Sequence, residues 1–464
     1  MLAEHATTVP TSVEGGRSKE IAAVVGDIEE FLREMVGQMP ATWASDRHEG
    51  AGRPRVLPAL ALWAGLLVCV LRGLSSQLEL WRVLSTKQLW FFPRFPLSDQ
   101  AVYARLVSGG VQPLEALFEQ ISQVLKERLA PYAQMSLAPF AADVIALDHT
   151  DLDQVARRLP TLRAIPTGDA RLLPGQLAGL FDLRRQQWRT VQFIADPNQN
   201  EKVTARDLVF SLAKNSLILC DLGFFGFAWF DDLTEHAYYF VSRLRKATTY
   251  QVIHTFYSRE ETFDGIIQLG KYRADRAKHA VRLVRFRHKG NLQSYITNVL
   301  DPRELPMIEI ARLYARRWDF ELAANLIKRH LNLHLLWSSK DVVIQQQVWA
   351  VLIISQILQA LRLEIAGRAE VDPFDVSMDL LVRWLPQFAD VGQDPIKEFV
   401  EQGRRLGFIR PSSRLKIQGP IIPDDELLPL PADLLLERVA RHANRNCGPR
   451  PSSHSGHQPT EQGN

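Results

Sequence analysis

Cysteine is scarce in this 464-residue sequence, which contains only Cys69, Cys220 and Cys447. Three scattered cysteines make neither an even disulfide framework nor the closely spaced pairs of a zinc site. The sequence therefore argues against a disulfide-stapled secreted domain and against a zinc module. The pattern suits a protein of the reducing cytosol.

An excess of one charge is also missing, because 55 Lys and Arg residues offset 52 Asp and Glu residues to a net charge of +3. Bulk charge therefore gives little support for a nucleic-acid partner, and only local clusters of cations can indicate one. Long hydrophobic runs are absent as well. The apolar runs 59–71 and 348–358 fall short of the roughly 20 residues that a membrane helix needs. We interpret both runs as buried helices, and expect neither a membrane partner nor, from the polar and acidic N-terminus, a signal peptide.

The organisation that remains is that of a globular protein with several domain-sized units, since 46% of the residues are hydrophobic and 23% are charged. We expect a disordered stretch (1–20), a helical DNA-binding or packing domain (21–135), an α/β domain (140–335), a helical region (336–440) and a disordered tail (444–464). A helix-turn-helix is an alternative to simple packing around 80–108, although packing is favoured. The cations that would then be available for phosphates are Arg72, Arg82, Lys87, Arg94 and Arg105.

The α/β domain has a distinctive order of elements. Strands are predicted at 143–152, twice within 175–194, at 216–225 and at 238–245, with helices at 201–215 and 226–237. This β-β-β-α-β-α-β order, followed by a long helix, predicts a ribonuclease H-like mixed sheet. Residues 246–305 read as a β-rich insertion. Its most basic part, 271–290, has interleaved aromatic residues, and phosphate contact is favoured there over a merely solvated sheet face.

The long helix is predicted at 306–331, with Pro306 at its start and no glycine inside it. Polar residues at helical spacing share one face of this helix: Tyr314, Arg317, Glu321 and Lys328. Trp318 lies close to the same stripe, and apolar residues occupy the opposite side. A solvated face with i,i+4 ion pairing is the simpler interpretation of such a stripe. A functional role requires further carboxylates that meet Glu321.

Two aspartates provide such carboxylates, because Asp148 and Asp221 each close a predicted strand. In a ribonuclease H-like sheet these strands are neighbours, so their carboxyl ends lie together, and the helix with Glu321 crosses the same edge. Three converging carboxylates repel one another unless a cation lies between them. Oxygen ligands select hard cations, which makes Mg²⁺ the first choice and Mn²⁺ a substitute. Two such ions would support phosphoryl transfer by activating a water or a 3′-hydroxyl.

These motifs resemble those of DDE transposases of the IS4 family of bacterial insertion sequences. The family signature, tyrosine, two residues, arginine, three residues, glutamate, six residues and lysine, is reproduced from Tyr314 to Lys328 without a gap. The second-aspartate motif fits Asp221-Leu222-Gly223-Phe224. The first one reads Asp148-His149-Thr150-Asp151-Leu152, in which histidine replaces the usual small residue. The resemblance covers about 140–335 with these specific motifs.

The resemblance implies a metal-dependent DNA transposase of the bacterial cytoplasm, associated with the nucleoid. Asp148, Asp221 and Glu321 would hold the metals, while Tyr314, Arg317 and Lys328 would contact phosphates. Trp318 would stack on an unpaired base, with core packing as the alternative for this side chain. The implied partners are the inverted-repeat ends of an element and its target DNA, held by at least a homodimer. Two alternatives stay open: a domesticated relative that binds DNA without cutting it, and another ribonuclease H-like nuclease.

Overall fold

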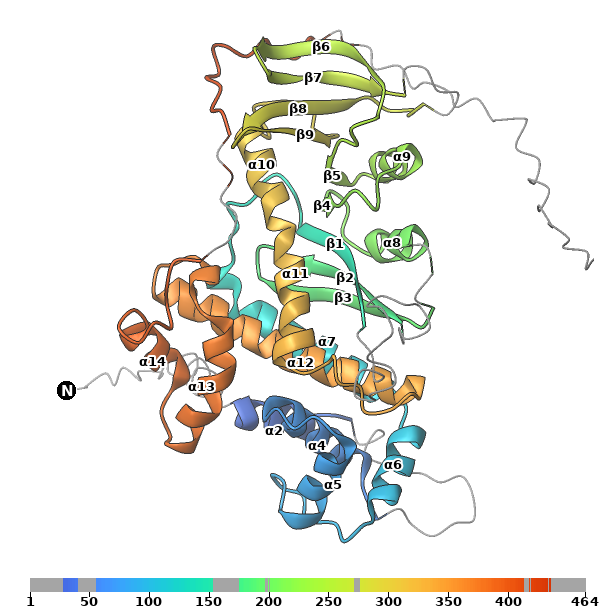
Figure 1. Cartoon of the computed structure of the whole chain (residues 1–464), viewed down its shortest axis with the longest axis vertical. Helices are drawn as coiled ribbons and strands as arrows, with labels where there is room; N and C mark the ends of the chain where they lie inside the picture. The colour runs from blue at the N-terminus through green and yellow to red at the C-terminus, as the bar shows by residue number, and fades with distance from the viewer. Residues whose placement is uncertain are drawn as a thin grey trace, which may run out of the picture.

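One mixed β-sheet with helices on both faces forms the centre of the protein (Figure 1). The computed structural model describes residues 28–40, 56–152, 175–196, 199, 201–270, 276–412, 417, 419–432 and 434. The two segments expected to be disordered, 1–20 and 444–464, lie outside these residues.

The sheet has nine strands in the order β3-β2-β1-β4-β5-β9-β8-β7-β6. The strands are β1 (Val144–Asp151), β2 (Gln176–Asp182), β3 (Gln187–Ile194), β4 (Leu217–Cys220), β5 (Tyr239–Arg243), β6 (Tyr250–Arg259), β7 (Thr262–Leu269), β8 (Val281–His288) and β9 (Asn291–Thr297). Antiparallel pairing joins β1, β2 and β3, whereas β1, β4 and β5 run parallel. This is the ribonuclease H-like topology, and the predicted fold class is confirmed.

Alternation along β1 sends its side chains to two different cores. Val144 and Ala146 belong to the core under α10 (Met307–Arg316) and α11 (Trp318–Asn325), while Ile145 and Leu147 belong to the core under α8 (Glu201–Phe210) and α9 (Phe227–Glu235). Figure 1 shows these two helix pairs on opposite sides of the sheet. By the same alternation, Asp148 follows Ala146 onto the face that α10 and α11 cover.

The helix predicted at 306–331 is not a single α-helix, which corrects the sequence-based expectation. It consists of α10, α11 and a π-helical turn, Leu326–His330. The break lies at Arg317, where the Arg317 N–H bonds the carbonyl of Tyr314 at 3.1 Å and the Phe320 N–H bonds that of Arg317 at 3.1 Å. Bonds to the third residue back, in place of the fourth, tighten the chain locally without a glycine or a proline.

The helical regions on either side of the sheet pack together. The long helix α12 (Asp341–Arg368) contacts α4 (Ala59–Leu71), α7 (Gln112–Arg128) and α14 (Pro395–Gln402), and one hydrophobic core runs through all of them. Further helices are α2 (Ile28–Gly37), α5 (Gln77–Thr86), α6 (Asp99–Ser108) and α13 (Met378–Asp390). Of the described residues, only α12 is long and apolar enough to cross a membrane, and 94% of its most apolar window is buried inside the protein. The prediction of a buried core helix is confirmed.

The suggested helix-turn-helix at 80–108 does not form. Residues 87–98 separate α5 from α6, whereas that motif uses a turn of about three or four residues. Arg105 is buried and donates to the carbonyl of Leu57 at 3.3 Å, so it cannot reach a phosphate. The favoured interpretation, packing, agrees with the structure.

The β-rich segment expected at 246–305 forms strands, but they extend the central sheet because β9 pairs antiparallel with β5. Within the basic stretch 271–290, residues 271–275 lie outside the described residues. Arg282 is fully buried in an ion pair with Asp264, and Arg285 donates to the hydroxyl of Tyr250 at 2.6 Å. These two cations stabilise the sheet. The expectation that the basic stretch contacts phosphate is therefore wrong for Arg282 and Arg285.

Candidate active site

Asp148, Asp221 and Glu321 converge at one edge of the sheet. β1 and β4 are parallel neighbours in which Leu147 pairs with Cys220, so the residues that follow, Asp148 and Asp221, lie at the same edge. Glu321 belongs to α11, which packs against β1. The predicted neighbourhood is therefore present, and its cause is the parallel pairing of two strands whose paired residues are 73 positions apart in sequence.

A glycine lets α11 approach this edge closely. Gly179 on β2 pairs with Asp148 on β1. A Cβ atom at Gly179 would lie 3.0 Å from the ring of Trp188 and 3.1 Å from that of Phe320 on α11. Phe320 is buried there, which fixes the helix turn that also carries Glu321.

Arg317 links two of the three carboxylates. Its Nη1 lies 2.5 Å from Oδ2 of Asp148 and its Nη2 lies 2.9 Å from Oε1 of Glu321. The Nε atom is buried and has no hydrogen-bond partner among the described residues. The tight turn between α10 and α11 thus places one guanidinium group against carboxylates from both the sheet and the helix.

The electrostatics of Asp148 follow from this crowding. Burial raises the pKa of Asp148 to about 7, repulsion from Asp221 and Glu321 acts in the same direction, and the Arg317 guanidinium and the His149 N–H oppose it. The Oδ1 atom of Asp148 accepts the His149 N–H at 2.9 Å. A carboxyl group with such a pKa lies in a place where a further cation would be favourable.

His149, the departure from the usual first-aspartate motif, points to the opposite face of the sheet. Its ring lies 5.5 Å from that of Phe224, which follows Asp221 after β4. Burial lowers the pKa of His149 to about 4, so the ring is neutral near pH 7. His149 therefore packs the two strand ends together without adding a positive charge beside Asp148.

Lys328 and Tyr314 flank the carboxylates. The Nζ atom of Lys328, in the π-helical turn, donates to the hydroxyl of Thr150 at 3.1 Å, and so reaches the end of β1. The ring of Tyr314 lies 5.1 Å from that of Tyr295 on β9. Burial raises the pKa of Tyr314 to about 12, so its hydroxyl keeps its proton as a hydrogen-bond donor. Trp318, in contrast, is 51% exposed.

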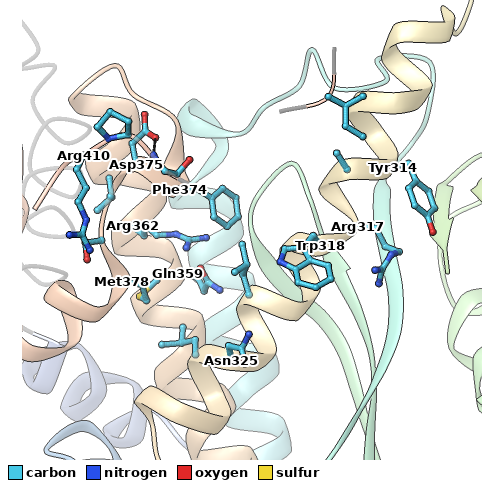
Figure 2. A pocket seen from close by; sticks show the side chains of 18 of the residues that line it. Tyr314, Arg317, Trp318, Asn325, Gln359, Arg362, Phe374, Asp375, Met378 and Arg410 are labelled. Carbon is cyan, nitrogen blue, oxygen red and sulfur yellow. Dashed lines mark hydrogen bonds between the residues drawn. The ribbon is translucent and has the colours of Figure 1, made fainter. Parts of the chain in front are cut away.

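A cavity of about 990 Å³ opens beside Arg317, between α10–α11 and the C-terminal region (Figure 2). Tyr314, Arg317 and Trp318 line it from the catalytic side. Sequence reasoning missed three further arginines in its lining, Arg243, Arg362 and Arg410. Arg243 could have been predicted from the sequence, because it is the last residue of β5, and β5 is the parallel neighbour of β4. The other two come from the C-terminal region and had no such signal.

The residues at the sheet edge fit a hard divalent cation by their chemistry. Asp148, Asp221 and Glu321 supply oxygen donors, and burial, with a smaller repulsion from Asp221 and Glu321, raises the pKa of Asp148. Within the described part of the chain, however, no group of three acidic, His or Cys side chains is already closed around one point. Arg317 lies between Asp148 and Glu321 in its place. A metal would therefore have to draw these carboxylates away from Arg317.

The sequence matches the family model of the transposase DDE domain over residues 160–357. This range includes Asp221 and Glu321 and begins after Asp148. Among curated proteins, the y4zB protein of Sinorhizobium fredii is 24% identical over 43% of this chain and 56% of its own length. InsG of Escherichia coli K12, a transposase for the insertion sequence element IS4, is 25% identical over 33% of this chain and 36% of its own length.

In both relatives the match spans less than two thirds of the relative's length. Among solved structures, a piggyBac transposase in a synaptic complex with hairpin DNA overlaps with a TM-score of 0.38 and 10% identity. That overlap covers 88% of this chain and 87% of the other. DDE transposases are typically metal-dependent phosphoryl-transfer enzymes, in keeping with the oxygen donors at the sheet edge. This chain carries a transposase DDE domain and is a distant relative of the IS4 transposase InsG.

Proposed function

We propose that this protein is a metal-dependent DNA transposase that cuts the ends of an insertion sequence and joins them to target DNA. The observation that carries the proposal is the convergence of Asp148, Asp221 and Glu321 at the carboxyl edge of the sheet, with Arg317 between two of them. A helix face that is merely solvated would not bring Glu321 together with aspartates from two strands, so this convergence favours a functional site. The transposase DDE domain supplies the reaction class.

Asp148, Asp221 and Glu321 would hold Mg²⁺, or Mn²⁺ as a substitute, in one or two sites. When bound, the cation would neutralise charge on the scissile phosphate and on the leaving oxygen. Asp148 gives up its proton above its pKa of about 7, so the site gains affinity for a cation as the pH rises.

Arg317 has a second task in this proposal. Its planar guanidinium group can exchange the carboxylates of Asp148 and Glu321 for a phosphate, which it binds with the same fork of N–H donors. Lys328, held by Thr150, supplies a point charge near the strand end. Tyr314 donates a hydrogen bond from a hydroxyl that stays protonated. Trp318 offers an exposed indole face for base stacking.

The partners follow from the reaction. They are duplex DNA with inverted-repeat ends and a target duplex, and pairing of two ends requires at least a homodimer. We place the reaction in the bacterial cytoplasm, at the nucleoid. The alternative is a relative that binds ends without cutting them. The observation that supports it is the pairing of Arg317 with the carboxylates of Asp148 and Glu321.

The proposal is tested with the full-length protein, the duplex ends of the native element and Mg²⁺, followed by mapping of the cuts. Asp148→Ala, Asp221→Ala and Glu321→Ala should each abolish cleavage and leave end binding in EDTA largely intact. Asp151→Ala is the matched control, because Asp151 lies at the end of the same strand but is exposed. We expect it to cut as the wild type does.

Two results would overturn the proposal. Binding without cleavage by the wild type would identify the silent relative. Cleavage by any of the three alanine variants at the wild-type rate would mean that the site has been assigned to the wrong residues.

A further inference from the structure

The residues on either side of Arg317 are anchored to one hairpin turn of the sheet. Asp319, two residues after Arg317, is 1% exposed, and its Oδ2 atom accepts a hydrogen bond from Nε2 of Gln186 at 3.0 Å. Arg316, the residue before Arg317, pairs with the same oxygen through its Nε atom at 3.3 Å. The Nη2 atom of Arg316 also donates to the carbonyl of Leu183 at 3.4 Å. Gln186 and Leu183 belong to the turn 183–186 that joins β2 to β3, so this turn holds the chain on both sides of Arg317.

The hairpin turn is itself held firmly. The Oδ1 atom of Asp182 accepts the N–H groups of Arg184 and Arg185 at 2.8 and 3.0 Å. The guanidinium group of Arg184 donates to four carbonyl groups of the segment 137–142. Gln186 is fully buried with a φ of 54°, a left-handed conformation that residues other than glycine rarely adopt. A shift of the turn would therefore break several hydrogen bonds at once.

The same hairpin pairs with the strand that carries Asp148. On β2, Gly179 lies opposite Asp148, and Phe320 of α11 packs over Gly179. A closed ring of contacts results, which runs from Asp148 through β2 and the hairpin turn to Asp319 and returns through Arg317 to Asp148. The contact of Asp319 with the turn is thus a second support of α11, in addition to the packing of Phe320.

The C-terminal helices reach this turn as well. The Nη2 atom of Arg362 on α12 donates to Oε1 of Gln186 at 3.3 Å. The guanidinium carbon of Arg362 in turn lies 4.3 Å from the centre of the Phe374 ring. The amide group of Gln186 therefore connects α12, on one side, with Asp319 at the start of α11, on the other.

Stability alone does not account for a carboxylate at this buried position. Replacement of a buried ion pair by apolar side chains of similar volume is often neutral or stabilising, because the charges must leave water. Apolar side chains, however, pack without a required direction, whereas the bonds of Asp319 to Gln186 and Arg316 depend on distance and angle. A carboxylate therefore suits a position at which the helix must be oriented.

We propose that Asp319 is a positioning residue of the metal site. Through the hairpin turn it fixes the start of α11, and so sets where Arg317 and Glu321 lie relative to Asp148. Asp319 acts through these side chains and contacts neither the cation nor DNA. The inference rests on the proposed function in one respect, namely that the three carboxylates at the sheet edge bind a divalent cation.

The test measures the Mg²⁺ concentration that gives half of the maximal thermal stabilisation of the full-length protein, without DNA, at pH 8. Asp319→Leu keeps the approximate shape of the side chain and removes both bonds. We expect it to raise this midpoint roughly 10- to 100-fold, the range for groups that orient metal ligands. Gln186→Met removes the donor from the other side and should act in the same direction. Asp319→Asn keeps an acceptor oxygen, so it should recover most of the wild-type midpoint.

Cleavage provides a second measurement. With the native ends and saturating Mg²⁺, the single-turnover rate of Asp319→Leu should fall by up to about 100-fold, as for a displacement of roughly 1 Å at a catalytic centre. The dissociation constant of the ends in EDTA should stay close to that of the wild type, because Asp319 does not contact DNA in this proposal. A change in rate without a change in binding separates positioning from a general loss of structure.

Asp264→Asn is the matched control. Asp264 is also 1% exposed and pairs with an arginine, but its partner Arg282 lies on β8. We expect this variant to lower the melting temperature and to leave the Mg²⁺ midpoint unchanged. An equal rise of the midpoint in Asp264→Asn, or wild-type midpoints in both Asp319→Leu and Gln186→Met, would overturn the inference.

The two proposals fail in different ways. A wild type that Mg²⁺ stabilises but that never cuts, with a midpoint that shifts only in the Asp319 and Gln186 variants, would refute the proposed function and support the positioning role. A wild type that cuts, with the same rate and midpoint in Asp319→Leu, would do the reverse. The absence of any Mg²⁺ stabilisation and of any cleavage in the wild type would refute both.

Discussion

Two arginine–aspartate pairs in this protein, one fully buried and one partly buried, are built very differently. Arg282 and Asp264 are 0% and 1% exposed, and their atoms meet as a fork, with Nε to Oδ1 at 2.7 Å and Nη2 to Oδ2 at 2.6 Å. The remaining Nη1 donates to the carbonyl of Leu305 at 2.6 Å. Arg317 and Asp148 are 13% and 15% exposed, share the guanidinium with Glu321, and border a cavity.

The difference separates a structural pair from an exchangeable one. Every donor group of Arg282 is used, and no ligand can reach it, so it can serve only the sheet. Arg317 has a buried Nε without a partner in the described part of the chain and holds a carboxyl group whose pKa is already raised to about 7. We expect such an arginine to change partners more readily than Arg282, and five experiments probe the contrast.

The largest effect is expected from Arg282→Met. Removal of the guanidinium group leaves Asp264 buried without a cation, which should lower the free energy of unfolding by about 3–5 kcal/mol. Urea unfolding followed by circular dichroism measures the loss. The double variant Arg282→Met/Asp264→Leu is the control and should recover most of it, because neither charge is then buried alone. A single variant as stable as the wild type would remove the distinction between the two pairs.

Arg317→Gln should cost less stability, and the cost should depend on pH. Near pH 5 Asp148 is protonated and does not need the guanidinium group, whereas near pH 8 its charge and that of Glu321 repel each other. Thermal melting at the two pH values measures this difference. In DNA binding, the same variant should lower the salt slope by about one. An unchanged slope together with pH-independent melting would return Arg317 to an ordinary surface pair.

Wild-type stability in EDTA should itself fall as the pH rises. The folded protein holds the Asp148 proton up to a pKa of about 7, but the unfolded chain releases it near 3.8. Between these values the folded state binds more protons, so the contribution of Asp148 is complete below 3.8 and is lost as the pH passes 7. Comparison of the melting temperature of wild type and Asp148→Asn from pH 5 to 8 isolates this contribution.

Addition of Mg²⁺ provides the complementary measurement. Stabilisation by the cation should be larger at pH 8 than at pH 6 in the wild type, because binding needs the ionised carboxylate. It should be much reduced in Asp148→Asn at both values. Equal Mg²⁺ stabilisation of both proteins would exclude Asp148 from the metal site.

The smallest effect is expected from Thr150→Val. This change removes the hydroxyl that Lys328 contacts at 3.1 Å and keeps the shape of the side chain. A single hydrogen bond of this kind contributes about 0.5–1.5 kcal/mol, so the melting temperature should change little. Lys328→Gln should in addition lower the salt slope of DNA binding by about one, which Thr150→Val should not. Equal slopes in the two variants would leave Lys328 with a purely structural role.

Local pattern was enough to predict the strands and most of the helices. The apolar content of β1 and β4 located each strand, although β1 continues past Asp148 to Asp151 and β4 ends at Cys220, earlier than the expected 225. The break at Arg317 was not predictable, because no glycine or proline marks it and only the hydrogen bonds of the folded chain show it. Phosphate contact was wrongly predicted for Arg282 in the basic stretch 271–290 for a similar reason, since its partner Asp264 lies on another strand.

What the sequence by itself determined is the chemistry: which carboxylates, cations and rings the site could use, and in what order they follow one another. Their positions were predictable because Asp148 and Asp221 follow the apolar parts of two strands that pair in parallel, and Glu321 lies on a helix. Only the tertiary structure decided that Arg317 lies between Asp148 and Glu321, and that Arg410 and Gln359 line the same cavity as Trp318. Those contacts join segments far apart in the chain, and their geometry depends on how the C-terminal helices pack against α11, which no local pattern encodes.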